Sequence, residues 1–129
     1  MKIFNHYPYR PERRAITLPA FWDFAWCGAI PLEDFNPRNA VYSLKLPVPG
    51  CFDVHPAFAG AAGTGCYRTQ FEAPQTDEYL RLTIEALGLR GRVFLDGAEI
   101  GDTVIPFTPL RIDFPAEKGL HTLEIAVNN

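Results

Sequence analysis

The residues best suited to chemistry are concentrated between Val48 and Phe71, in the stretch VPGCFDVHPAFAGAAGTGCYRTQF. A zinc site would need cysteine or histidine ligands at a short spacing such as C-x-x-C. Cys51, His55 and Cys66 lie in this stretch without that spacing. We therefore expect neither a metal site nor any other cofactor.

The same stretch contains residue types used in nucleophilic catalysis and in phosphate binding. A cysteine nucleophile needs a histidine that the fold brings to it, and the sequence leaves open a pair of Cys66 with His55 or His121. His121 itself precedes an alternating run near a turn, where we expect it to be exposed. The glycine-rich residues 60–65 lack the Lys-Ser/Thr pair of a phosphate loop and lead into a strand, which argues against phosphate binding.

Carboxylates are numerous, but their positions do not indicate catalysis. A glycoside hydrolase needs two carboxylates at a defined separation whose pKa values are shifted in opposite directions. Most of the 15 acidic residues, such as Glu85, Asp96 and Glu124, fall at strand-exterior or turn positions, where we expect a solvated face. These positions do not indicate a catalytic pair of carboxylates.

Length and composition favour a single globular domain. The chain has 129 residues, of which 47% are hydrophobic, and its net charge is −3, so it has no concentrated basic surface for nucleic acid or anionic membranes. The only basic cluster, RPERR, lies in residues 10–14, where we expect it to be solvated. We assign residues 1–14 to an N-terminal arm and residues 15–129 to one β-sandwich domain.

The N-terminal sequence indicates in which cellular compartment we expect the protein. No long apolar segment follows Lys2, so we expect no secretory signal. No segment approaches the roughly 20 apolar residues of a membrane helix. We expect a cytoplasmic protein whose three cysteines are reduced thiols.

Alternating hydrophobicity predicts an all-β chain. In YLRLTIEAL the apolar positions Leu80, Leu82 and Ile84 point to one face. The pattern repeats in HTLEIAV. The residues predicted to point inward are Leu123, Ile125 and Val127, and those predicted to point outward are Thr122, Glu124 and Ala126. Such alternation is typical of half-buried antiparallel strands.

Other short strands are predicted at residues 22–26, 41–46, 66–71, 91–95 and 110–114. Asp96-Gly97 tolerates the positive φ angles of a tight turn and predicts a hairpin after residues 91–95. The sequence PLEDFN, residues 31–36, predicts at most one helical turn. Short strands separated by turn residues indicate a β-sandwich or jelly roll.

Six segments, taken in order, resemble the N-terminal sugar-binding jelly-roll domain of glycoside hydrolase family 2, which includes β-galactosidases, β-glucuronidases and β-mannosidases. The segments are Trp22-Asp23-Phe24; Val48-Pro49-Gly50 with Phe52-Asp53; Gly65-Cys66-Tyr67-Arg68; Val93-Phe94-Leu95-Asp96-Gly97 with Ile100-Gly101; Thr108-Pro109-Leu110 with Asp113; and Gly119 with Leu123 to Asn129.

This resemblance implies a galactose-binding-domain-like fold without catalysis of its own. In the family, both catalytic glutamates belong to a separate (β/α)₈ barrel, and a further segment and closing strand follow the position of Asn129. Two departures concern possible substrate contacts. Residues 105–107 replace a Gly-Gly-Tyr, and Ala62 stands where some β-galactosidases have an asparagine.

The resemblance also points to residues 48–71 as a loop that leans toward the mouth of the barrel. Phe52, Asp53, His55 and Tyr67 are the candidates for sugar contact, because aromatic faces stack on sugar rings and carboxylates accept hydrogen bonds from their hydroxyls. The alternative is that Phe52 and Tyr67 are core or loop anchors and that Asp53 forms a turn.

Three functions follow from these observations. The first is a non-catalytic accessory domain of a β-galactosidase or β-glucuronidase type enzyme, with carbohydrate and the remaining domains of the parent glycosidase as partners. The second is a free-standing carbohydrate-binding module, and the third is a structural or oligomer-forming domain. If a closing strand follows Asn129, we expect the open sheet edge to cause homo-oligomerisation or to be covered by residues 1–14.

Overall fold

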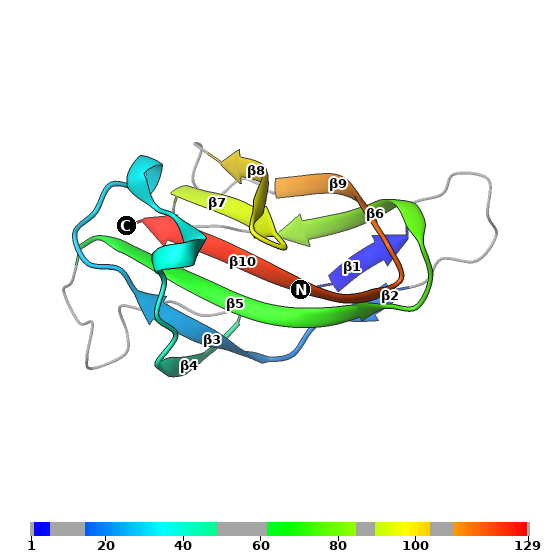
Figure 1. Ribbon diagram of the computed structural model, residues 1–129, viewed down its shortest axis with the longest axis horizontal. Coiled ribbons are helices and arrows are strands. Elements are labelled where there is room, and N and C mark those ends of the chain that lie inside the picture. Colours follow the sequence, from blue (N-terminus) through cyan, green and yellow to red (C-terminus); the bar gives the residue numbers. More distant parts are fainter. Residues whose placement is uncertain (1, 6–14, 49–61, 85–89, 104–109, 129) are drawn as a thin grey trace.

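Two antiparallel β-sheets make up almost all of the described chain (Figure 1). The computed structural model describes residues 2–5, 15–48, 62–84, 90–103 and 110–128. The strands, in chain order, are β1 (Lys2–Asn5), β2 (Ala15–Thr17), β3 (Phe21–Trp26), β4 (Leu44–Pro47), β5 (Thr64–Ala73), β6 (Asp77–Ile84), β7 (Arg90–Leu95), β8 (Ala98–Thr103), β9 (Leu110–Ala116) and β10 (Gly119–Asn128).

The smaller sheet has four strands in the order β2-β1-β6-β9, and the larger has six in the order β4-β3-β5-β10-β7-β8. Strand β1, from the N-terminal arm, pairs with β2 on one side and with β6 on the other. In the larger sheet, β10 pairs with β5 along its whole length and with β7 over its second half. These two sheets confirm the predicted all-β sandwich.

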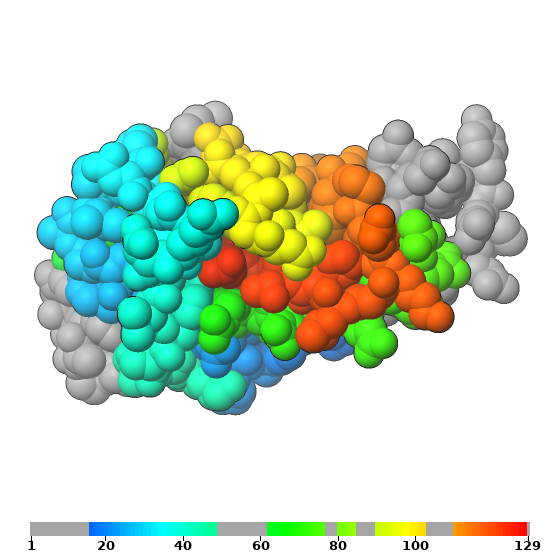
Figure 2. Space-filling view, viewed as in Figure 1, coloured from blue at the N-terminus to red at the C-terminus, as the bar shows by residue number. Residues whose placement is uncertain are grey.

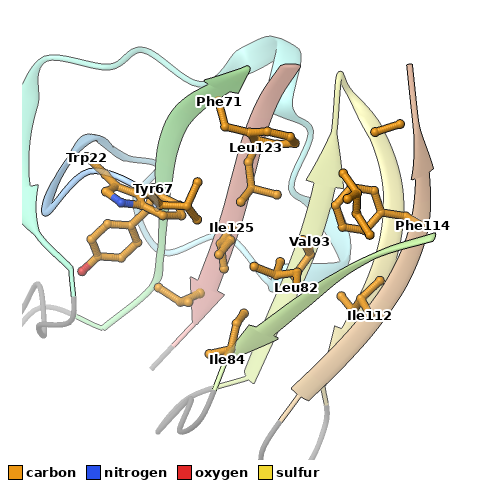
Figure 3. Close-up of a cluster of buried hydrophobic side chains, with 14 of the residues drawn as sticks. Trp22, Tyr67, Phe71, Leu82, Ile84, Val93, Ile112, Phe114, Leu123 and Ile125 are labelled. Carbon is orange, nitrogen blue, oxygen red and sulfur yellow. The ribbon is translucent and has the colours of Figure 1, made fainter. Parts of the chain in front are cut away.

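The core lies between the two sheets (Figure 3). The smaller sheet contributes Leu80, Leu82 and Ile84 from β6, which are all buried, as their alternation predicts. Strand β9 adds Ile112 and Phe114. From the larger sheet the principal residues are Trp22, Phe24, Tyr67, Phe71, Val93, Leu123, Ile125 and Val127.

The predicted hairpin is confirmed. Leu95 pairs with Ala98, and the two residues between them have positive φ angles, 50° at Asp96 and 85° at Gly97. Two positive φ angles are required by the turn type whose twist matches that of the flanking strands.

One predicted strand start needs correction. Strand β4 begins at Leu44 rather than at Val41, although the Ser43 amide still donates a hydrogen bond to the Phe24 carbonyl of β3 at 3.3 Å. The predicted helical turn is a 3₁₀ turn, η1 (Leu32–Asp34), and a second one, η2 (Pro37–Asn39), follows it.

The outer face of the larger sheet, which points away from the smaller sheet, is covered at one end. The cover is the β3–β4 connection, residues 27–43, which includes η1 and η2; Figure 2 shows it in cyan and teal beside β10 and β5. A second apolar cluster forms beneath it from Leu32, Phe35, Cys66, Phe94 and Ala126. The prediction that Glu124 and Ala126 point to solvent is therefore wrong, since they are 7% and 0% exposed.

None of the helices in the described part of the chain is long and apolar enough to cross a membrane.

Candidate functional site

The four sugar-contact candidates are distributed unevenly over the structure. Phe52, Asp53 and His55 lie outside the described residues. Tyr67 lies in β5 among the buried side chains of the core (Figure 3) and is 7% exposed. Its ring packs against that of Phe24, with 5.0 Å between the ring centroids. Little of the Tyr67 ring is open to a sugar, so its position agrees with that of a core anchor.

The described residues on either side of residues 49–61 lie at opposite ends of β3. Pro47 pairs with Phe21 at the start of β3, and the Val48 amide donates to the Ala20 carbonyl at 2.8 Å. Gly65 pairs with Trp26 at the other end of the same strand. Because β4 and β5 are both antiparallel to β3, which lies between them, they are parallel to each other.

A row of four charged side chains crosses the outer face of the larger sheet. Glu124 of β10 is opposite Arg68 of β5, Arg68 is opposite Asp23 of β3, and Asp23 is opposite Lys45 of β4. Asp23 pairs with Arg68 at 3.1 Å and with Lys45 at 3.2 Å. We call Glu124, Arg68, Asp23 and Lys45 the charged row.

Burial alone would raise the pKa of Asp23, but the hydrogen bonds and positive charges of Arg68 and Lys45 outweigh burial and hold it below its usual value. The Asp23 carboxylate is therefore an ionised partner of two cations. One of its oxygens contacts Lys45 and the other contacts Arg68. The carboxylate is not a protonated acid ready to protonate a leaving group.

Tyr42, from the β3–β4 connection, covers the row. The Arg68 guanidinium lies 3.9 Å from the centroid of the Tyr42 ring, and the Tyr42 hydroxyl donates a hydrogen bond to the Glu124 carboxylate. The Cys66 thiol lies 3.2 Å from the same hydroxyl. Burial is the main reason why the pKa of the Tyr42 phenol is raised.

Cys66 is a protonated thiol in this environment. Burial raises its pKa to about 12, so little thiolate exists near neutral pH. His121 is five register positions away along β10, roughly 16 Å at about 3.3 Å per residue, so Cys66 and His121 form no catalytic pair. Among the described residues, no group of three His, Cys, Asp or Glu side chains is placed to hold a metal ion.

His121 differs from its predicted environment. Its side chain is only 12% exposed, and it forms an ion pair with Asp96. The two partners are 25 residues apart and meet because the β7–β8 turn lies beside the start of β10.

The first half of the β3–β4 connection is fixed by polar contacts to its backbone carbonyls. One guanidinium nitrogen of Arg92 donates to the carbonyls of Leu32 and Phe35, each at 3.0 Å. The Thr64 hydroxyl donates to the Ile30 carbonyl at 2.8 Å and accepts a hydrogen bond from the Asn128 amide at 2.8 Å. These contacts order the covering residues relative to the sheet.

A charged hollow of about 260 Å³ lies between η1 and the β7–β8 hairpin. Four of its five charged residues form ion pairs, Arg90 with Glu33 and Arg92 with Glu99, and the fifth, Asp102, also lines the hollow. The Arg92 contacts to the connection occupy a further nitrogen, so both arginines of the hollow are already engaged by the chain.

Comparisons with known proteins place this geometry in context. No protein-family model and no curated protein matches the chain. Its fold is similar to part of a solved GH2 β-galacturonidase from Eisenbergiella tayi bound to galacturonate, with a TM-score of 0.69 and 24% identity over 88% of this chain and 20% of that enzyme. It is also similar to β-glucuronidase from Ruminococcus gnavus in complex with uronic deoxynojirimycin, with a TM-score of 0.75 and 21% identity over 95% of this chain and 23% of that one.

The chain thus spans about a fifth of the length of these two enzymes, and at these identities the likeness is one of fold.

Several motif residues singled out in the sequence have structural uses here. Gly65 lies so close to Phe24 that an added Cβ would meet its ring at 2.5 Å, and Gly101 approaches Ile112 equally closely across the two sheets. Arg68 and Asp23 pair with each other. Tyr42 was missed by sequence reasoning, and no local pattern distinguishes it, because its partners come from β5 and β10.

Proposed function

We propose that this chain is a non-catalytic accessory domain of a family 2 glycoside hydrolase of the β-glucuronidase or β-galactosidase type. In this proposal it acts in the cytoplasm, beside the remaining domains of the parent enzyme, and helps to shape the substrate site. Phe52, Asp53 and His55 would make the sugar contacts. Tyr67 would anchor the strand that follows them, because its ring is held in the core.

The observation that carries the proposal is the pattern of coverage. The fold likeness includes 95% of this chain but 23% of the Ruminococcus gnavus enzyme, which is the relation expected between one domain and a multidomain glycosidase. The order of the six motif segments along the chain supports the same assignment.

The described polar groups also favour a role without catalysis. Asp23 is paired with two cations, Glu124 accepts from Tyr42, and the Cys66 thiol has a raised pKa. Catalysis of glycoside hydrolysis needs one carboxyl group kept protonated and one kept ionised across the scissile bond. Neither described carboxylate of the charged row is arranged for that task.

An activity assay tests the proposal. Residues 1–129 should release no 4-nitrophenol from aryl glucuronides, galacturonides, galactosides or mannosides, whereas a gene product whose reading frame continues past Asn129 into a barrel should hydrolyse at least one of them. Saturable turnover by residues 1–129 that disappears on replacement of one of their own acidic residues would refute an accessory role.

Sugar affinity separates this function from the free-standing carbohydrate-binding module. Calorimetric titration of residues 1–129 with glucuronate, galacturonate, galactose and mannose should show no saturable heat if the site is completed only in the parent. Affinity in the isolated chain that Phe52→Ala abolishes would favour the binding module. Phe21→Ala is the matched control, because Phe21 is 62% exposed and belongs to β3.

A further inference from the structure

His121 lies between two hydrogen-bond acceptors at one end of the sandwich. Its Nδ1 is 2.7 Å from Asp96 Oδ2, and its Nε2 is 2.6 Å from the Glu117 carbonyl oxygen. The ring stacks on Phe71 of β5, with 5.4 Å between centroids and an angle of 27° between planes. The imidazole is therefore fixed in position by three contacts.

Only the protonated ring can satisfy both acceptors. A neutral imidazole carries one N–H, so one of its nitrogens would present a lone pair to an oxygen lone pair. The imidazolium carries two N–H groups and donates to both. A backbone carbonyl cannot become a donor, and Asp96 also accepts from the Thr122 amide through Oδ1 at 2.8 Å.

The surrounding charges agree with this protonation state. From the β7–β8 turn the facing group is the Asp96 carboxylate, and from the β9–β10 turn it is Glu117, followed in sequence by Lys118. Strand β5 presents Phe71, which carries no charge. Burial lowers the pKa of His121, but the Glu117 carbonyl and the Asp96 carboxylate outweigh burial and raise it overall.

These contacts join two turns, beside the hydrogen bonds between Asp96 and Thr122 that already place the β7–β8 turn at the start of β10. Asp96 belongs to the turn that links β7 to β8, and Glu117 belongs to the turn that enters β10 from β9, the last strand of the other sheet. We propose that His121 is a protonation-dependent latch that holds the β7–β8 turn against the β9–β10 turn and that opens when the imidazolium loses its proton. This proposal is independent of the function proposed above.

The direction of the pH dependence follows from the raised pKa. The stabilisation is fully present below the pKa of a histidine in an unfolded chain, about 6.5, and is lost as the pH rises through the higher pKa of folded His121. The latch therefore opens on the alkaline side.

Nuclear magnetic resonance tests the protonation state directly. Long-range proton–nitrogen spectra of residues 1–129 should show both ring nitrogens of His121 protonated at a pH slightly above about 6.5, where a free imidazole is mostly neutral. A single protonated nitrogen at that pH would overturn the proposal, and this measurement needs no variant.

Amide exchange tests the latch itself. The Thr122 amide donates to Asp96 Oδ1, and the Asp96 amide donates to the Thr122 carbonyl at 2.8 Å. After division by the intrinsic exchange rates, the opening constant of these two amides should rise as the pH passes through the folded pKa. The total rise should equal the ratio of the acid dissociation constants of His121 in the open and closed states.

Three variants complete the test. His121→Gln should make the opening constant independent of pH in this range, and Asp96→Asn should lower the pKa of His121. Glu117→Gln is the matched control, because it keeps the backbone carbonyl and removes only the side-chain charge, so it should lower the pKa of His121 less than Asp96→Asn does. An opening constant of the wild-type chain that stays flat through the titration of His121 would also overturn the latch.

Discussion

The hydroxyl of Tyr42 donates a hydrogen bond to the carboxylate of Glu124, a residue 82 positions away in the sequence. Tyr42 belongs to the β3–β4 connection and Glu124 to the middle of β10, so this contact ties the cover to the centre of the larger sheet. Glu124 is 7% exposed. A carboxylate at that burial needs a donor.

Tyr42→Phe should lower the free energy of unfolding by about 2 kcal/mol, because it leaves the buried Glu124 carboxylate without the hydroxyl that bonds it. The substitution keeps the aromatic ring against the Arg68 guanidinium, so the change reports on the hydroxyl alone. Urea denaturation provides the measurement. In a double-mutant cycle with Glu124→Gln, the two losses should not add, and additive losses would mean that the hydroxyl and the carboxylate do not interact.

Asp23→Asn should weaken the dependence of the free energy of unfolding on pH in the acidic range. The pKa of Asp23 is lowered by its two cationic partners, so its stabilisation is present above the pKa of an unfolded aspartate, about 3.9, and is lost as the pH falls through the lower folded pKa. Because the row is partly exposed, the effect should be at most about 1 kcal/mol.

Urea titrations over a series of acidic pH values would measure the effect of Asp23→Asn. Asp34→Asn is the control, since Asp34 is exposed in η1 and forms no ion pair with any described residue. If the free energy of unfolding changed equally with pH in both variants, the charged row would be excluded as the cause of the effect.

Gly97→Val should cost roughly 1 kcal/mol or more, because φ is 85° at this position and a β-branched residue is strained there. An added Cβ at Gly97 would meet no heavy atom within 4 Å, so the whole cost comes from the backbone. Gly97→Asn should retain more stability than the valine variant, because asparagine tolerates this conformation. Equal melting temperatures for wild type and Gly97→Val would contradict the strain argument.

Gly63→Ala should be more damaging than Gly97→Ala, for a different reason. An added Cβ at Gly63 would lie 2.2 Å from the Gly28 carbonyl oxygen. That oxygen accepts the Thr64 amide at 2.9 Å, so it cannot move without breaking a hydrogen bond. We expect a loss of about 1–3 kcal/mol in thermal or urea unfolding, typical of overpacking. A smaller loss than that of Gly97→Ala would show that the backbone yields at this contact.

Deletion of residues 1–14 should destabilise the chain and promote self-association. Strand β1 lies between β2 and β6, so its loss leaves β2 without a neighbour and exposes the backbone groups of one edge of β6. An exposed edge is a template for pairing with another chain. Light scattering and urea unfolding of both forms would measure the effect. A monomeric deletion variant with unchanged stability would show that β1 contributes nothing to the sheet.

The sequence predicts the inner faces of the strands better than the outer ones. Leu80, Leu82 and Ile84 alternate with polar residues, and the alternation is sufficient to identify their face. In β10 the same rule places Glu124 and Ala126 in solvent, and it is wrong because residues 27–43 cover that face. A cover formed by residues so distant in sequence leaves no periodic signal in the strand that it covers.

The side-chain partnerships were harder to predict than the strands. The environment of His121 depends on Asp96 and Glu117, which approach it only after two turns have formed. Tyr67 looks the same in the sequence whether it faces a sugar or the core, and its contact with Phe24 depends on the register of β3 against β5. The proposed roles of Phe52, Asp53 and His55 stay predictions.

The position of β10 in the larger sheet bears on how the protein is made. Residues 119–128 form the strand that separates β3-β4-β5 from β7-β8, although every other strand of that sheet precedes them in the sequence. A ribosome synthesises the chain from its N-terminus, so the two halves of the sheet emerge first and have no direct pairing with each other. Until residues 119–128 leave the exit tunnel, both halves keep an unpaired edge, and an unpaired edge is a template for pairing with another strand.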